Sequence, residues 1–162
     1  MKVVMDSDCL IKLVKAGAKE AVVAAMDVFI PPAVKRETVE EAKKRGYQDA
    51  AIIEENIAAG KIELAKPRTA SLRDMMLTKG EGEVFSLYQR GGYDVIASDD
   101  DKFLRKLHLS NIPFLTPAAC IVYVARNRGI EKSTAVEMLE RLSQYVSRDE
   151  YMTARYAVEE RA

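Results

Sequence analysis

The sequence predicts an α/β fold with a mostly parallel sheet of about five strands and helices on both faces. Short apolar runs alternate with longer segments of helical periodicity, and prolines and glycines separate the two kinds of segment. Parallel strands need crossover connections, usually helices, so this alternation is typical of a parallel sheet covered on both sides. A length of 162 residues fits one domain.

Five short runs have the apolar character of buried strands, at residues 2–5, 28–30, 62–65, 95–97 and 113–115. Helical segments are expected at residues 8–25, 33–45, 48–59, 71–77, 81–90, 101–109 and 118–128. Pro31 and Pro32 open the second of these helices, and Gly60 closes the third. Gly91 and Gly92 close the helix that precedes the fourth strand.

The chain beyond Gly129 is also expected to be helical. Apolar residues at helical spacing run from Val136 to Val146 after Ser133, a candidate N-cap, and a further helix is expected at residues 148–161. We therefore predict a domain at residues 1–128 and a C-terminal helical extension of the same domain at residues 129–162. This extension could pack on the domain or on a second subunit, and the pattern allows both.

Composition excludes several classes of protein. The 25 basic and 25 acidic side chains give a net charge of zero, which does not fit a strongly basic nucleic-acid-binding domain. Cys9 and Cys120 form neither a disulfide framework nor a metal-ligand cluster, and are expected to be reduced core thiols. The first acid follows only three apolar residues, and the longest apolar stretch is broken by Pro117. We expect a soluble cytoplasmic protein.

Two groups of acids stand where strands are expected to end. Asp6 follows the first strand and Asp99 follows the fourth. In an open parallel sheet, ligands bind in the crevice beyond the carboxyl ends of the strands. Carboxylates brought together there repel one another unless a cation lies between them, and an all-carboxylate site favours Mg²⁺ or Mn²⁺ over zinc.

Helix capping is the alternative explanation for these acids. Asp8 could cap the helix that follows it, and Asp99 or Asp100 could cap the helix that contains Phe103. However, five of the six residues in the segments 6–8 and 99–101 are acidic, which is more than two caps can use. This surplus favours a metal site.

Three glutamates lie near the apolar side of predicted helices. Glu37 follows Val34 by three residues, and Glu81 precedes Val84 by three, so each shares a helix face with an apolar residue. Glu83 lies nearer the edge of that face. The glycines beside Glu81 and Glu83 allow close backbone approach, which favours a functional role over a simple interaction with the helix N-terminus.

Four pieces of the sequence, in this order, resemble the PIN domain: VVMDSDCLI at 3–11, IPPAVKRE at 30–37, GEGE at 80–83 and ASDDDKF at 97–103. The resemblance covers about residues 1–128. It implies a three-layer α/β/α sandwich and a metal-dependent ribonuclease. Many members of the family are VapC-type toxins, so the resemblance also implies that an antitoxin protein could be a partner.

By position, Asp6 matches the first acid of the family pattern and Glu37 the second. The third falls on Glu81 or Glu83, because the E-x-E spacing permits either, and the fourth falls on Asp99. Asp8 stands where the family commonly has a small hydroxyl or amide, which leaves its role open. The resemblance implies that Mg²⁺ or Mn²⁺ is held by acids among Asp6, Glu81, Glu83, Asp99 and Asp101.

This chemistry needs no histidine or cysteine nucleophile. One or two ions, about 3.5–4 Å apart when paired, activate water and stabilise the oxygen that leaves the phosphodiester. Because carboxylates repel phosphate, basic residues near the site are expected to bind the RNA. The candidates are Lys12, Lys102, Arg105 and Lys106.

Two other functions fit parts of the sequence. The D-x-D pattern at Asp6 and Asp8 is also found in haloacid-dehalogenase-type phosphatases, although that family leaves Glu37 unexplained. A catalytically silent PIN-fold interaction protein is the other alternative. Apolar residues on the C-terminal extension and on the helix at 48–59 also predict a homodimer.

Overall fold

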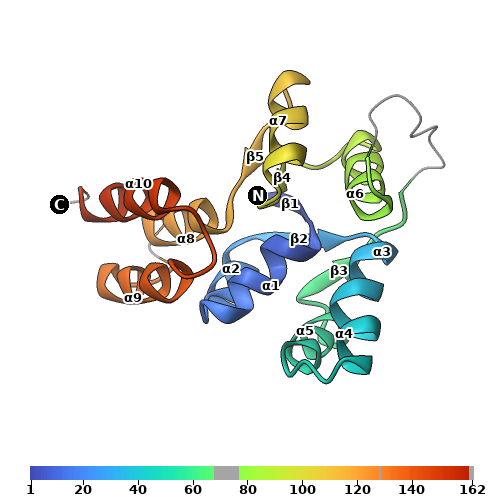
Figure 1. Ribbon diagram of the computed structural model, residues 1–162, viewed down its shortest axis with the longest axis horizontal. Helices are drawn as coiled ribbons and strands as arrows, with labels where there is room; N and C mark the ends of the chain where they lie inside the picture. Colours follow the sequence, from blue (N-terminus) through green and yellow to red (C-terminus); the bar gives the residue numbers. More distant parts are fainter. Residues whose placement is uncertain (68–76, 128, 161–162) are drawn as a thin grey trace.

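The computed structural model describes residues 1–67, 77–127 and 129–160 (Figure 1). Five parallel strands form a sheet in the order β3-β2-β1-β4-β5. The strands are β1 (Lys2–Met5), β2 (Asp27–Ile30), β3 (Ile62–Leu64), β4 (Val95–Ala97) and β5 (Phe114–Leu115). Helices cover both faces of this sheet, so the predicted three-layer α/β/α fold is confirmed.

The helices divide between the two faces of the sheet (Figure 1). On one face lie α1 (Ser7–Lys15), α2 (Lys19–Ala25), α5 (Asp49–Ala58) and α8 (Pro117–Arg126). On the other lie α6 (Lys79–Gln89) and α7 (Asp101–Leu109). No helix within the described residues is both long enough and apolar enough to cross a membrane.

The central strand β1 explains the apolar character of the first predicted strand. Val3 pairs with Val28 of β2 on one side and with Val95 of β4 on the other. Val3 and Val4 are fully buried, because helices cover both faces of the sheet at this position. A strand buried on both faces is a continuous apolar run rather than an alternating one.

The single helix expected at residues 8–25 is wrong, because the chain forms two helices there. Gly17 lies between α1 and α2 with a φ of 68°, a conformation that favours glycine and ends α1. The start of α1 also differs from the expectation. It begins at Ser7, with Asp6 as its N-cap, so Asp8 lies in the first turn and does not cap the helix.

The helix that follows Pro31 contains a π-helical segment. Its parts are α3 (Pro32–Lys35), the π segment η1 (Arg36–Glu41) and α4 (Ala42–Lys44). The buried Thr38 hydroxyl donates to the Val34 carbonyl at 2.8 Å and so occupies an acceptor of the helical ladder. Glu37 lies in this segment, and π segments are frequent at functional sites.

The C-terminal extension packs on the rest of the chain through α9 (Lys132–Leu142) and α10 (Arg148–Glu159). Leu139 and Leu142 are fully buried in the common core. Glu131, not Ser133, is the N-cap of α9, so the expected cap was wrong by two residues. The helix expected at 71–77 falls almost entirely at 68–76, outside the described residues.

Candidate active site

The acids that follow strands β1 and β4 lie at the point where the chain changes direction across the sheet. From β1 the chain proceeds to β2 and β3 on one side, and then to β4 and β5 on the other. Asp6 follows β1, and its backbone N–H donates to the Ala97 carbonyl of β4 at 3.0 Å. Ligands of open α/β sheets bind at such a switch point.

A cavity of about 200 Å³ opens at this edge. It is lined by Asp6, Ser7, Asp8, Val34, Glu37, Thr78, Gly80, Glu81 and Asp100. The five acids among them come from the end of β1, the start of α1, the π segment, the first turn of α6 and the N-cap of α7. The fold therefore brings acids from distant parts of the sequence to one small cavity.

Asp6 is the most buried of these acids, with 8% of its surface exposed. One carboxylate oxygen accepts from the Cys9 backbone N–H at 2.8 Å, and the other accepts from the buried Ser98 hydroxyl. Burial raises the pKa of Asp6 to about 7, against the effect of these two hydrogen bonds, and the charges of Asp8 and Asp99 add to the increase. Burial makes the negative charge of Asp6 unfavourable. A cation bound beside this carboxylate would offset that cost.

Glu37 faces the same cavity from the π segment. Its Oε2 accepts from the Ser7 hydroxyl. Its Oε1 lies against the backbone of Gly80, where a Cβ would stand only 3.0 Å away. The glycine predicted from sequence to permit close approach therefore makes room for the Glu37 carboxylate.

The structure distinguishes Glu81 from Glu83. Glu81 lines the cavity and forms a capping box with Thr78, whose backbone N–H donates to Glu81 Oε2 at 2.9 Å. Glu83 lies elsewhere, because its Oε2 accepts from the Ala33 backbone N–H at 2.8 Å at the start of α3. The geometry therefore places Glu81, and not Glu83, with Asp6 and Glu37.

Asp99 and Asp101 do not line this cavity. Asp99 forms a largely buried ion pair with Lys12 of α1. It also interacts with Glu150 of α10, whose pKa is raised by burial and further by the Asp99 charge. Asp101 is exposed in the first turn of α7 and lines a different cavity, beside Phe114. The acid that follows β4 and reaches the acidic cavity is Asp100, which also caps α7 through the Phe103 backbone N–H at 2.8 Å.

The four basic residues predicted to bind RNA have different surroundings. The Lys12 ammonium is paired with Asp99, and the Lys106 ammonium lies 3.7 Å from Glu81 Oε2. Lys102 and Arg105 are exposed on α7. Two of the four therefore balance charge near the acids, while the other two remain accessible to a phosphate.

The cavity fits a hard divalent cation in donor type and number, since its five acids supply oxygen ligands. The present side-chain conformations do not form a coordination site. Among the described residues, no group of three or more His, Cys, Asp or Glu side chains is arranged to hold a metal ion. Instead, Asp6, Glu37 and Glu81 accept hydrogen bonds from the protein.

Sequence reasoning missed the hydrogen-bond donors that hold the acids in place. Ser98 donates to Asp6 and accepts from the Asp100 backbone N–H at 3.2 Å, and Ser7 donates to Glu37. Both serines directly adjoin an acid in the sequence, which is a usable signal. Glu150 had no such signal, because its contact with Asp99 depends on how α10 packs.

Comparison with known families identifies the family of the chain. A family model described as a PIN domain matches residues 2–160, and no curated protein matches the chain. The chain belongs to the PIN domain family. The family model extends through α9 and α10, beyond the residues that carried the sequence resemblance. Members of this family are generally nucleases, and the assignment removes the haloacid-dehalogenase alternative.

Proposed function

We propose that this protein is a ribonuclease that hydrolyses RNA phosphodiesters with Mg²⁺ or Mn²⁺ bound by its carboxylates. The observation that carries the proposal is the convergence of Asp6, Asp8, Glu37, Glu81 and Asp100 on one cavity at the carboxyl edge of the sheet. A bound divalent cation would lower the pKa of a water molecule and offset the charge of the phosphate.

The residues of the chain have separate roles in this proposal. Asp6 is held by the N-terminus of α1 and the Ser98 hydroxyl, so its carboxylate is oriented in advance. Glu37 and Glu81 face it from the π segment and from α6. Because an ionised carboxylate has about four lone-pair sites, these acids can coordinate a cation while they still accept from Ser98, Ser7 and Thr78.

Lys102 and Arg105 are the proposed contacts to the RNA backbone. Both are exposed on α7, whose N-cap Asp100 lines the acidic cavity. A phosphate bound there would therefore lie within a few residues of the carboxylates. Such contacts weaken as the salt concentration rises, because counterions compete for the phosphate.

The test of catalysis is Mn²⁺-dependent cleavage of single-stranded RNA by the wild type and by Asp6→Asn. We expect activity to fall by about 10²–10³ in the variant, because a charged ligand is lost. The asparagine still offers an acceptor to the Cys9 N–H. Asp27→Asn is the matched control, since Asp27 is exposed at the other end of the parallel strands, and it should retain full activity.

Metal binding should be measured separately by the increase in melting temperature on adding Mn²⁺. The increase should be large in the wild type and Asp27→Asn and much smaller in Asp6→Asn. Cleavage that needs no metal, or that survives Asp6→Asn, would contradict the proposal. Metal binding without cleavage of any RNA in a broad panel would favour the alternative, a silent interaction protein.

A finer hypothesis is that the protein is the toxin of a toxin–antitoxin pair and acts in the cytoplasm. Its support is membership of the PIN family, in which such toxins occur. The hypothesis requires a neighbouring small gene for an antitoxin. Co-expression of that gene product should restore growth to cells in which the wild type, but not Asp6→Asn, stops growth.

A further inference from the structure

A cavity of about 450 Å³ lies between α7 and the edge strand β5, which are neighbours in the fold (Figure 1). It is lined by Asp101, Leu104, Arg105, His108, Leu109 and Phe114, none of which lines the acidic cavity. Four of these residues follow the spacing i, i+3, i+4 and i+7 along α7, so they share one face of the helix. The buried Phe103 and Leu107 hold a different face of α7 against the core.

The polar side chains of this α7–β5 cavity have no partner among the described residues. Asp101 and Arg105 stand at i and i+4, a spacing that permits a helical ion pair, but the structure shows none between them. Both are exposed, as is His108. Leu104 and Phe114 are partly buried against the core and supply an apolar wall. The cavity therefore offers a carboxylate, a guanidinium and an aromatic ring to a ligand.

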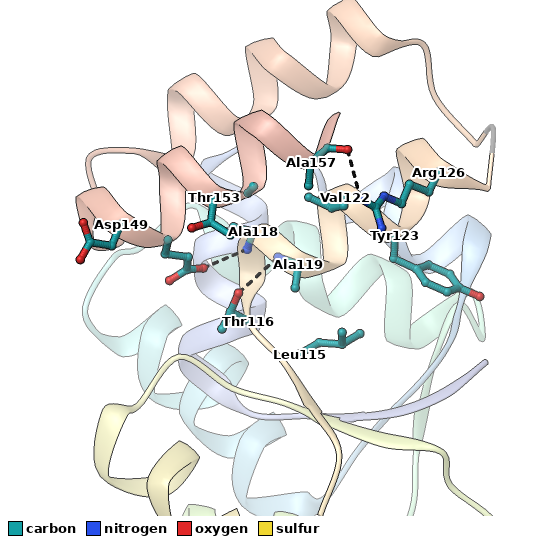
Figure 2. Close-up of a pocket in the computed structure, with 12 residues that line it drawn as sticks. Leu115, Thr116, Ala118, Ala119, Val122, Tyr123, Arg126, Asp149, Thr153 and Ala157 are labelled. Carbon is teal, nitrogen blue, oxygen red and sulfur yellow. Dashed lines mark hydrogen bonds between the residues drawn. The ribbon is translucent and has the colours of Figure 1, made fainter. Parts of the chain in front are cut away.

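A larger cavity, of about 590 Å³, lies between α8 and α10 and differs in its chemistry (Figure 2). Phe114 lines the α7–β5 cavity and Leu115 lines the larger one, so the two cavities open on opposite faces of the sheet. In the larger cavity Glu150 already accepts from the Ala118 backbone N–H at 3.2 Å. Its two acids, Asp149 and Glu150, would also repel a phosphate. An RNA strand is therefore expected on the α7 side.

Helix α7 connects the α7–β5 cavity to the acidic cavity. Asp100, the N-cap of α7, lines the acidic cavity, and the next residue, Asp101, lines the α7–β5 cavity. On the neighbouring face of the helix, the Lys106 ammonium lies 3.7 Å from Glu81 Oε2, and Lys102, one turn earlier, is exposed. An RNA strand with one phosphate at the acidic cavity would pass Lys102 and bring an adjoining nucleotide to the α7–β5 cavity.

We propose that the α7–β5 cavity binds one unpaired guanine base of the RNA, close to the phosphate that is cleaved. This proposal rests on the proposed ribonuclease activity and names the base that the site selects. The Phe114 ring offers a stacking surface, as aromatic side chains do for other unpaired bases. Asp101 accepts hydrogen bonds from the base, and Arg105 binds an adjoining phosphate.

The choice of guanine follows from the carboxylate of Asp101. An ionised carboxylate only accepts hydrogen bonds, so it selects an edge of a base that donates them. N1–H and N2–H₂ of guanine are adjacent donors and match the two oxygens of one carboxylate. Adenine and cytosine each place an acceptor nitrogen beside their amino group, and uracil flanks its N–H with two carbonyl oxygens. Base pairing would occupy this edge of guanine, so the RNA must be single-stranded at this position.

The test of binding compares oligouridines that carry one guanine or one inosine, which lacks the 2-amino group. Fluorescence anisotropy is measured at fixed salt on Asp6→Asn, so that the RNA stays intact, with and without the second substitution Asp101→Asn. With Asp101 present, inosine should raise the dissociation constant at least about fivefold, because one donor to the carboxylate is lost. In Asp101→Asn the two RNAs should bind about equally.

Asp149→Asn is the matched control, since Asp149 is also an exposed aspartate in the first turn of a helix, and it should keep the full difference between guanine and inosine. Phe114→Leu keeps an apolar side chain but removes the ring, so it should weaken the binding of both RNAs. Equal affinity for guanine and inosine with Asp101 present overturns the proposal. An inosine effect that survives Asp101→Asn overturns it as well.

Cleavage of a random-sequence RNA pool with Mn²⁺ separates this proposal from the ribonuclease proposal. Sequencing of the products of the wild type should show guanine enriched at one fixed position near the cut, and Asp101→Asn should remove that enrichment. Cleavage without any base preference would overturn the guanine site and leave the ribonuclease activity standing. Binding that discriminates guanine from inosine, without cleavage, would contradict the ribonuclease activity and support the guanine site.

Discussion

Individual acids of this protein have both structural and chemical roles. Asp6 caps α1, and Asp100 caps α7, yet both line the acidic cavity. Capping and ligand binding were treated as alternatives on the basis of sequence. They are compatible because an ionised carboxylate has about four lone-pair sites, so it can accept from a backbone N–H and still have sites left for a ligand.

Lys12 also has a structural role that the sequence did not suggest. The hydrogen bond and charge of Asp99 raise the pKa of Lys12, although its burial acts in the opposite direction. Without this ammonium, Asp99 and Glu150 would face each other as uncompensated, partly buried charges. We expect Lys12→Met to lower the free energy of unfolding by about 1–3 kcal/mol at pH 7. Chemical denaturation is the measurement.

The pH dependence of Lys12→Met identifies the cause of this loss. The pKa of Glu150 is already raised, so protonation should relieve the repulsion as the pH falls. The difference in the free energy of unfolding between Lys12→Met and the wild type should be largest near neutral pH. It should shrink towards pH 4.5, which is the ordinary pKa of a glutamate. Lys12→Arg is the control and should be nearly as stable as the wild type. A deficit that does not vary with pH would point to lost packing instead.

At the scale of elements, local sequence located the helices but not their interruptions. Gly17 ends α1, and Thr38 accompanies the π segment that presents Glu37. Periodicity averages over several turns, so a single glycine or hydroxyl that changes the backbone locally leaves the pattern nearly unchanged. Contacts between helices and strands determine which of these local changes in the backbone are present in the folded protein.

A polar cluster connects α2 to α5 and gives a second testable pH dependence. The Lys19 ammonium is buried, donates to the Ile52 carbonyl at 3.1 Å and lies 2.7 Å from Glu20. The Lys19 hydrogen bond, with help from Asn56 and Lys61, lowers the pKa of Glu20 to about 2. Glu20 therefore contributes stability that is fully present above its unfolded pKa of about 4.5.

We expect Glu20→Gln to lower the melting temperature at pH 7, and the difference from the wild type to disappear as the pH falls from about 4.5 to about 2. Because Glu20 is largely exposed, the effect should be small and should decrease in high salt. Glu63→Gln is the control, since Glu63 is exposed on β3. Equal losses at every pH would rule out the ion pair as the cause.

At the scale of the whole molecule, the C-terminal helices share the main core. Leu139 and Leu142 of α9 and Ala154 of α10 belong to the same buried cluster as Val3 and Leu10. This packing uses the apolar side chains that sequence analysis had assigned either to the domain or to a second subunit. The tertiary structure therefore assigns the buried side chains of α9 to the domain's own core.

A single substitution tests whether the chain unfolds as one unit. Leu139→Ala should lower the free energy of unfolding by about 2–5 kcal/mol, because it leaves a cavity in the shared core. The transition should remain single, with the same midpoint for α-helical signal and tyrosine fluorescence. Met152→Ala, at an exposed site on α10, should have little effect. Two separate transitions would show that residues 129–162 unfold independently.

The sequence by itself determined the order of strands and helices, the parallel sheet, and the presence of acids beyond β1 and β4. These features depend on local composition and periodicity, which the chain carries in short segments. Only the tertiary structure decided that Glu81 and Asp100 join Asp6 and Glu37, that Glu83 binds the start of α3, and that Asp99 pairs with Lys12. The physical reason is that a carboxylate can accept hydrogen bonds from many different donors. The packing of helices that are distant in sequence determines which donor lies within reach.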